Sequence, residues 1–215
     1  HALGSPKSTE HDDIIFVVLD PDQLVTRPIE IDYTPYIDSM DWVTPQQSPL
    51  LISHGHPASQ QYLMGGNWVN MIQKNLTKIF ETMSDDEAAS SPLLSITAED
   101  AVEYYNGGPP YIAPGRDMYL IVSTWAQIAI PVYNLTDNFL SEMFAYSAAS
   151  AHVGLKHHLS RSFMVSHARI KGEAWRWVDA KSGSEVCNTR TNYADAVKAS
   201  RGAEYLPNVI HFCQR

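Results

Sequence analysis

The feature that most constrains the fold is an apolar run that ends in an acidic turn. Ile14–Leu19 is entirely apolar, and all of it except Leu19 is β-branched or aromatic. Such a short run predicts a strand buried on both faces. Pro21 cannot continue a central strand, so we expect the strand to stop at Asp20-Pro21-Asp22. Ligands bind at strand ends in open α/β sheets, and divalent cations favour paired carboxylates, so Asp20 and Asp22 are candidate metal ligands. The alternative is an acidic turn that only ends a strand.

Composition limits the class of protein. The 215 residues are 44% hydrophobic, enough for a substantial core, and we expect a single α/β domain over residues 1–215. The net charge is −9, and Lys and Arg are scattered, which argues against a nucleic-acid partner. Because the chain begins at His1 and ends at Arg215 directly after an apolar run, we interpret it as a fragment cut at both ends.

Three features bear on the cellular compartment. Asn75-Leu76-Thr77 and Asn134-Leu135-Thr136 match the N-glycosylation pattern and favour the secretory lumen. Cys187 and Cys213 could pair there. The span Met118–Thr136 has no charge and raises the question of a transmembrane segment, but its polar residues favour a buried helix followed by a loop.

Periodicity and turn residues give a coarse secondary structure. Apolar spacing predicts helices over Trp68–Met83, Met118–Ala129 and Phe139–Leu155. Thr97 with Asp100 predicts a helix start, Gly107-Gly108 its end, and Gly108-Pro109-Pro110-Tyr111 a fixed extended turn. Strands are expected at Leu50–Ser53, Phe163–Val165, Trp175–Trp177 and Val209–Cys213, and an irregular surface segment at residues 27–50.

Three further candidates follow from these elements. Glu142 falls in the first turns of the third helix, where a lone glutamate is either a partner of the helix dipole or a catalytic group. His211 is a lone imidazole inside an apolar strand, so it is either a core histidine or a ligand. His54 and His56 could bind a metal, but nothing near them in the sequence completes a site.

Several stretches together resemble one group of Golgi glycosyltransferases. They are the strand with its Asp-Pro-Asp turn and Arg27-Pro28, then Gly108–Met118 leading to Trp125, Ser141–Gly154, and Ile210–Arg215. Their order and combination are similar to the hydroxyproline O-arabinosyltransferases of plants and algae and to the related peptidyl serine α-galactosyltransferases. The resemblance covers roughly residues 13–166 and the end of the chain.

The resemblance implies a GT-A-like domain with a mainly parallel sheet flanked by helices. Members transfer arabinofuranose or galactose from a UDP-sugar to a peptidyl hydroxyl with retention of configuration, and manganese is the usual metal. By position, Asp20, Asp22 and His211 match the metal ligands, and Glu142 matches an acidic residue toward the acceptor side, where we also expect Gly108–Tyr111. The resemblance also implies a Golgi or secretory-pathway lumen, and a parent protein anchored as a type II membrane protein.

The chemistry of these residues suits that reaction. Cleavage of a sugar–diphosphate bond leaves charge on the phosphate, which a divalent cation held by two carboxylates stabilises. A neutral imidazole suits Mn²⁺ better than Mg²⁺ as a further ligand.

Two departures and two rivals remain. Glu30–Ser53 matches the family poorly, and the βαβ segment that normally cradles the uridine is missing, so we expect half of a donor site and an inactive fragment. One rival is an Asp-x-Asp phosphohydrolase, which would need a downstream Ser or Thr and a Lys that we do not find arranged. The other is a secreted carbohydrate-binding module with a structural metal.

Overall fold

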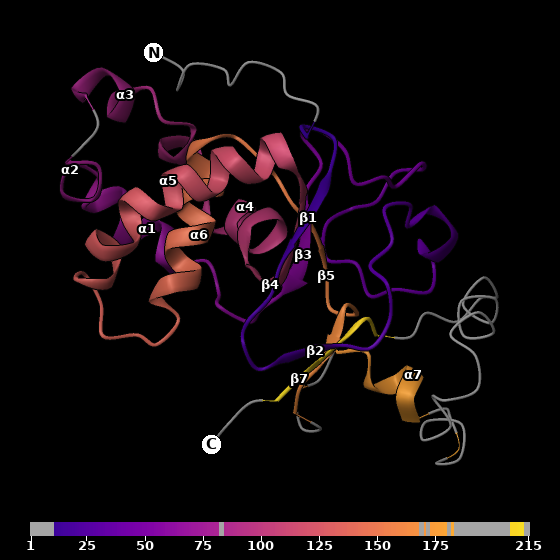
Figure 1. Ribbon diagram of the computed structural model, residues 1–215. Helices are drawn as coiled ribbons and strands as arrows, with labels where there is room; N and C mark the ends of the chain where they lie inside the picture. Colours follow the sequence, from indigo (N-terminus) through magenta and orange to yellow (C-terminus); the bar gives the residue numbers. More distant parts are fainter. Residues whose placement is uncertain are drawn as a thin grey trace.

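The computed structural model describes residues 11–81, 84–167, 170, 173–179, 182 and 207–212. Two small sheets stand at its centre, with most of the helices on one side of the larger sheet and irregular chain on the other (Figure 1). The expected α/β class is confirmed. The described elements are β1 Ile15–Val18, β2 Gln23–Val25, η1 Thr34–Tyr36, β3 Ala58–Gln61, α1 Asn67–Lys74, α2 Leu76–Ile79, α3 Asp85–Ala89, η2 Pro92–Ser95, α4 Ala98–Asp100, η3 Ala101–Tyr105, β4 Gly107–Pro114, α5 Gly115–Tyr133, α6 Ser141–His152, β5 His158–Ser160, β6 Met164–Val165, α7 Trp175–Asp179 and β7 Val209–His211.

The larger sheet is mixed and has the strand order β1–β4–β3–β5. Both β1 and β3 run antiparallel to β4, whereas β5 runs parallel to β3. The prediction of a mainly parallel sheet is therefore wrong. Because β1, β3 and β5 point the same way, their carboxyl ends lie at one edge of the sheet, where β4 begins.

Strand β1 lies at an edge of this sheet. Among the described residues it pairs with β4 alone, and Ile14, Phe16 and Val17 are 49%, 46% and 36% exposed. The prediction of a strand buried on both faces is wrong. An apolar run indicates extended chain, but it does not report how many neighbours the strand will have.

Strand β4 is central and buried along its whole length, although it contains two consecutive prolines. Pairing with β3 jumps from Ser59–Tyr111 to Gln60–Gly108, and pairing with β1 covers Tyr111–Pro114. Pro109 and Pro110 thus lie between the paired positions, where their missing N–H groups break no ladder bond. The helix end predicted at Gly107-Gly108 is nearly correct, because the helical turns of α4 and η3 end at Tyr105 and Asn106 follows. The extended turn predicted at Gly108–Tyr111 is wrong, because these residues belong to β4.

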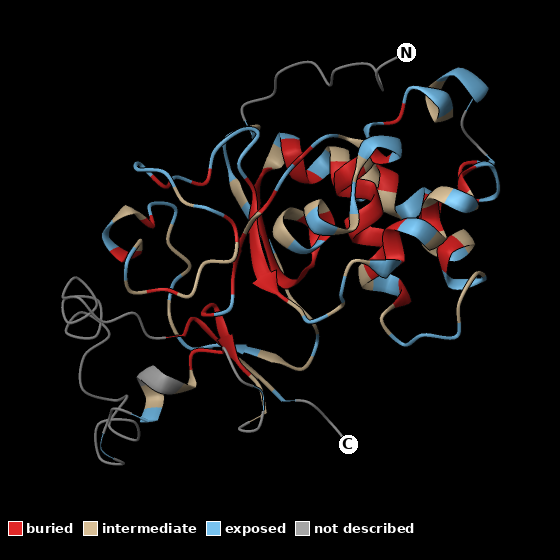
Figure 2. Cartoon of the chain, turned by 180° about the vertical axis from the view of Figure 1, so that it is seen from behind, coloured by how far each residue is buried: buried red, intermediate tan, exposed pale blue. Residues whose placement is uncertain are grey.

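The alternation of β4 divides the core into two clusters. Tyr111 and Ala113 pack with the helices, whereas Ile112 packs with Tyr33, Phe163 and the other apolar side chains beneath the irregular segment. Figure 2 shows the resulting buried band through the sheet and the inner faces of the helices. The central strands β3 and β4 are therefore covered on both faces, whereas the edge strand β1 is partly exposed.

The helices agree with the periodicity except at their ends. The first predicted helix is interrupted at Asn75, which separates α1 from α2, and Met83 lies outside the described residues. Thr97 and Asp100 form the expected reciprocal cap at the start of α4. Helix α5 continues through Pro131 to Tyr133, and α6 is shorter than predicted. None of the described helices is long and apolar enough to cross a bilayer.

The smaller sheet has the order β2–β7–β6. β6 and β7 confirm the strands expected near residues 163–165 and 209–213, although both are shorter. The strand predicted at Trp175–Trp177 is wrong, because these residues belong to α7. The strand predicted at Leu50–Ser53 is reduced to isolated bridges at Leu51 and Ser53. Cys187 and Cys213 lie outside the described residues.

Candidate functional site

The acidic turn after β1 is a hydrogen-bonded β-turn. The Asp20 carbonyl accepts from the Gln23 N–H at 3.0 Å, and Pro21 occupies the second position, where its fixed φ suits such a turn. The Asp20 N–H donates to Oε1 of Gln23 at 3.1 Å. Proline therefore ends β1 and places Asp20 and Asp22 at the carboxyl end of the strand.

Gln23 ties this turn to the rest of the molecule. Its Nε2 donates to the Pro109 carbonyl on β4 at 3.0 Å and contacts the sulfur of Met164 on β6 at 3.7 Å. One side chain thus links the turn to both sheets. Gln23 is not among the residues predicted for the site, and the sole signal for it in the sequence is its place directly after the Asp-x-Asp pair.

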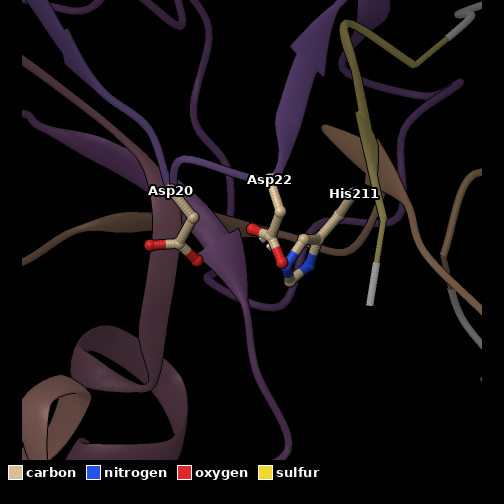
Figure 3. A group of neighbouring side chains, drawn as sticks. All are labelled: Asp20, Asp22 and His211. Atoms are coloured by element: carbon tan, nitrogen blue, oxygen red, sulfur yellow. Dashed lines mark ion pairs between the residues drawn. The ribbon is translucent and has the colours of Figure 1, made fainter. Parts of the chain in front are cut away.

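The end of the described chain brings His211 to the same turn. In the antiparallel pairing of β2 with β7, His211 lies opposite Gln23, and the Phe212 N–H donates to the Asp22 carbonyl at 2.9 Å. His211 Nε2 lies 3.1 Å from Oδ1 of Asp22, with the imidazole 12% and the carboxylate 36% exposed. Figure 3 shows the two side chains next to each other, with Asp20 on the other side of Asp22. The expected proximity of His211 to Asp22 is observed.

These three side chains fit a divalent cation. One ligand atom from each of Asp20, Asp22 and His211 lies within 4.8 Å of the others. Two ligand atoms held at about 2.2 Å from a common ion are at most about 4.4 Å apart, so little movement would be needed. Two carboxylate oxygens and one imidazole nitrogen form a donor set that Mn²⁺ accepts.

The electrostatics of the site also favour a cation. Burial raises the pKa of Asp20, the neighbouring His211 lowers it, and the charge of Asp22 raises it. Partial desolvation by neighbouring groups also raises the pKa of Glu142, and the charge of Asp20 adds to that rise. Three carboxyl groups therefore lie near one another, and a bound cation would offset their repulsion.

Packed aromatic side chains surround the helical turn that follows Glu142. Glu142 itself is exposed and lies in the first turn of α6. Tyr146, one turn further along, stacks on Tyr111 with ring centroids 3.6 Å apart, and Trp125 contacts both rings edge-on. Burial raises the pKa of Tyr111 well above its usual value, with smaller contributions from the nearby charges of Glu142 and Asp20. Glu142 is thus held near the acidic turn by packed side chains.

The other expected residues divide into two groups. The residues expected on the acceptor side, Gly108, Pro109, Pro110 and Tyr111, are all buried in β4 and expose no side chain to an acceptor. His54 and His56 do not share a site. His54 contacts Asp13 and Asp117, whereas His56 stacks on His158.

Comparison with protein-family models, with curated proteins and with solved structures gives no match. The likeness to the peptidyl glycosyltransferases therefore stays a resemblance of sequence motifs. The basis for a functional proposal is therefore the arrangement of Asp20, Asp22, His211 and Glu142.

Proposed function

We propose that this chain is part of a metal-dependent, retaining glycosyltransferase domain, and that the parent protein acts on a UDP-sugar donor and a peptidyl hydroxyl acceptor. The observation that carries the proposal is the meeting of Asp22 with His211, 189 residues later in the chain (211 − 22), at the end of β1. An acidic turn alone needs no such partner. The sugar is arabinofuranose or galactose, and the acceptor hydroxyl belongs to hydroxyproline or serine.

In this proposal the residues have separate tasks. Asp20, Asp22 and His211 would hold Mn²⁺, which when bound supplies positive charge to the leaving diphosphate. Gln23 fixes the turn so that the two carboxylates keep their relative positions. Glu142 faces the acceptor and orients its hydroxyl, and its raised pKa lets it accept that proton more readily than an ordinary surface glutamate would.

The same proposal places the parent protein in the Golgi or another secretory compartment, as a type II membrane protein. The motif at Asn134 supports this location because Asn134 is exposed. The Asn75 motif offers weaker support, because the Asn75 side-chain amide donates to the Met71 carbonyl at 2.9 Å.

A thermal-shift experiment on the chain extended at its N-terminus tests the function. We expect Mn²⁺ to raise the melting temperature, and UDP to raise it further only when Mn²⁺ is present, because a ligand that binds the native state stabilises it by mass action. Stabilisation by the metal alone would instead favour the carbohydrate-binding module. Metal-dependent cleavage of a phosphate monoester would favour the phosphohydrolase.

Replacement of Glu142 by glutamine is expected to lower turnover at least about tenfold while donor binding changes little, because Glu142 acts on the reacting groups and not on the diphosphate. Transfer and donor cleavage would be measured in the parent protein, on the same preparation as the melting temperature. Glu99→Gln is a matched control, since Glu99 occupies the first turn of α4 as Glu142 does that of α6. A helix-dipole role is worth only about 0.3–1 kcal/mol. Equal turnover in the two variants would leave Glu142 with that structural role.

A further inference from the structure

A cavity opens at the end of the larger sheet opposite the acidic turn. Its volume is about 560 Å³, within the range of small-molecule sites. The irregular segment before β3, Tyr104 of η3 and the segment that leads into β5 form its walls. Because β3 and β5 both begin here, the cavity lies at their amino ends, whereas the acidic turn follows the carboxyl end of β1. The two sites are therefore separate.

The charge of this cavity differs from that of the whole chain. The net charge is −9, yet Lys156 brings a positive charge to this lining, which has no aspartate or glutamate. Pro45, Pro49 and Leu51 supply an apolar wall. Such a lining suits a small molecule that combines an apolar body with a negative group.

Lys156 is held in place at the rim. Its Nζ lies 4.2 Å from the centre of the Tyr104 ring, within the range of a cation–π contact. Two residues before Lys156 lies Gly154, whose φ of +74° suits glycine. Lys156 directly precedes His157, which is buried and hydrogen-bonded to the Tyr146 hydroxyl at 2.9 Å. Hydrogen bonds from Thr97 lower the pKa of Asp100, and the charge of Lys156 adds to that effect, but Asp100 does not line the cavity.

A stacked pair of imidazoles forms the inner wall. His56 and His158 have ring centroids 5.6 Å apart and an interplanar angle of 15°. Nδ1 of His158 is buried and, among the described residues, has no hydrogen-bond partner. Burial, with a smaller contribution from His56, lowers the pKa of His158 to about 4, so the ring is neutral at pH 7 and can donate one N–H. Both rings line the cavity, so a ligand bound there would lie against the imidazole pair.

We propose that this cavity binds a small organic oxyanion, a carboxylate or a phosphate ester with an apolar body. Lys156 attracts the negative group, the His56–His158 pair faces it, and the proline-rich wall contacts the body. The site does not depend on the metal-binding turn, so it stands or falls separately from the proposed transferase activity.

Titration of the full chain by NMR tests this site, with the histidine ring signals as the readout. Benzoate and phenyl phosphate are the probes, benzyl alcohol is the uncharged match, and EDTA with constant ionic strength excludes metal and salt effects. We expect saturable shifts of the His56 and His158 signals with at least one anion and none with the alcohol. Tighter binding of benzoate would assign a carboxylate ligand, and tighter binding of phenyl phosphate a phosphate ester.

The variant Lys156→Gln should weaken anion binding about tenfold or more, because a charge-assisted contact is lost. Lys156 is exposed, so the fold should be kept. Lys78→Gln, an equally exposed lysine on α2 that does not line the cavity, should bind as the wild type does. Unsaturable shifts with both anions, equal binding of benzyl alcohol, or unchanged affinity in Lys156→Gln would each overturn the proposal.

Discussion

Asp22→Asn is expected to weaken Mn²⁺ binding at least about 100-fold, since loss of groups that merely orient metal ligands already costs 10–100-fold. The amide of asparagine keeps the shape of the side chain but removes its charge, so one of the two anionic ligands is lost. Transfer, where it can be measured, should fall with metal occupancy. Isothermal titration with Mn²⁺ measures the binding directly and does not depend on the choice of sugar or acceptor.

The metal-free fold should survive this substitution. Asp22 is partly exposed and lies near the like charge of Asp20, so its neutralisation removes repulsion while weakening the contact with His211 that the described residues show. We therefore expect a melting temperature close to that of the wild type without metal, and a smaller rise when Mn²⁺ is added. Asp38→Asn is the matched control, because Asp38 is an exposed carboxylate in the irregular segment and outside the acidic cluster. Undiminished Mn²⁺ affinity in Asp22→Asn would rule out the assigned site.

The core of this site could be read from the sequence because its first half is local. A β-branched run followed by Asp-Pro-Asp specifies both the end of a strand and two carboxylates beyond it. His211 was harder, since a lone imidazole in an apolar strand is compatible with a buried core. Its link to the turn was expected from the resemblance to a family, and the pairing of β7 with β2 is what brings it there.

The wrong predictions of secondary structure concern segments in which strand pairing overrides local composition. Pro109 and Pro110 indicated a turn, but register on both sides of β4 leaves room for two residues without N–H groups. No local pattern contains that information, because it depends on β1 and β3 together. The same holds for β1, whose apolar run fits a buried central strand as well as the partly exposed edge strand observed. Gln23 was missed because its role depends on Pro109 and Met164, both distant in sequence.

The helical layer contains a close approach between Gly66 and the backbone of Ala98, which the sequence does not indicate. The variant Gly66→Ala tests how much this contact matters for stability. Gly66 precedes α1 with φ −98°, a conformation open to any residue, so an alanine there meets no backbone strain. An added Cβ would, however, overlap the carbonyl oxygen of Ala98 and lie 2.8 Å from its Cβ and 2.9 Å from its carbonyl carbon. Because backbone atoms cannot rotate away, we expect a loss of about 2–3 kcal/mol in the free energy of unfolding. The melting temperature should fall by roughly 5–10 °C.

Two companion variants separate this contact from other effects of losing a glycine. Gly55→Ala introduces backbone strain but no clash, since the φ of Gly55 is +81° and nothing lies within 4 Å of the added Cβ. It should lower the free energy of unfolding by only about 1 kcal/mol. Ala98→Gly removes one of the crowded atoms but leaves the carbonyl group, so combining it with Gly66→Ala should restore little stability. If the double variant regained the wild-type melting temperature, the Ala98 side chain and not its backbone would be the obstacle. If Gly55→Ala were the more damaging single variant, the close packing of α1 against α4 would not be a main source of stability in the helical layer.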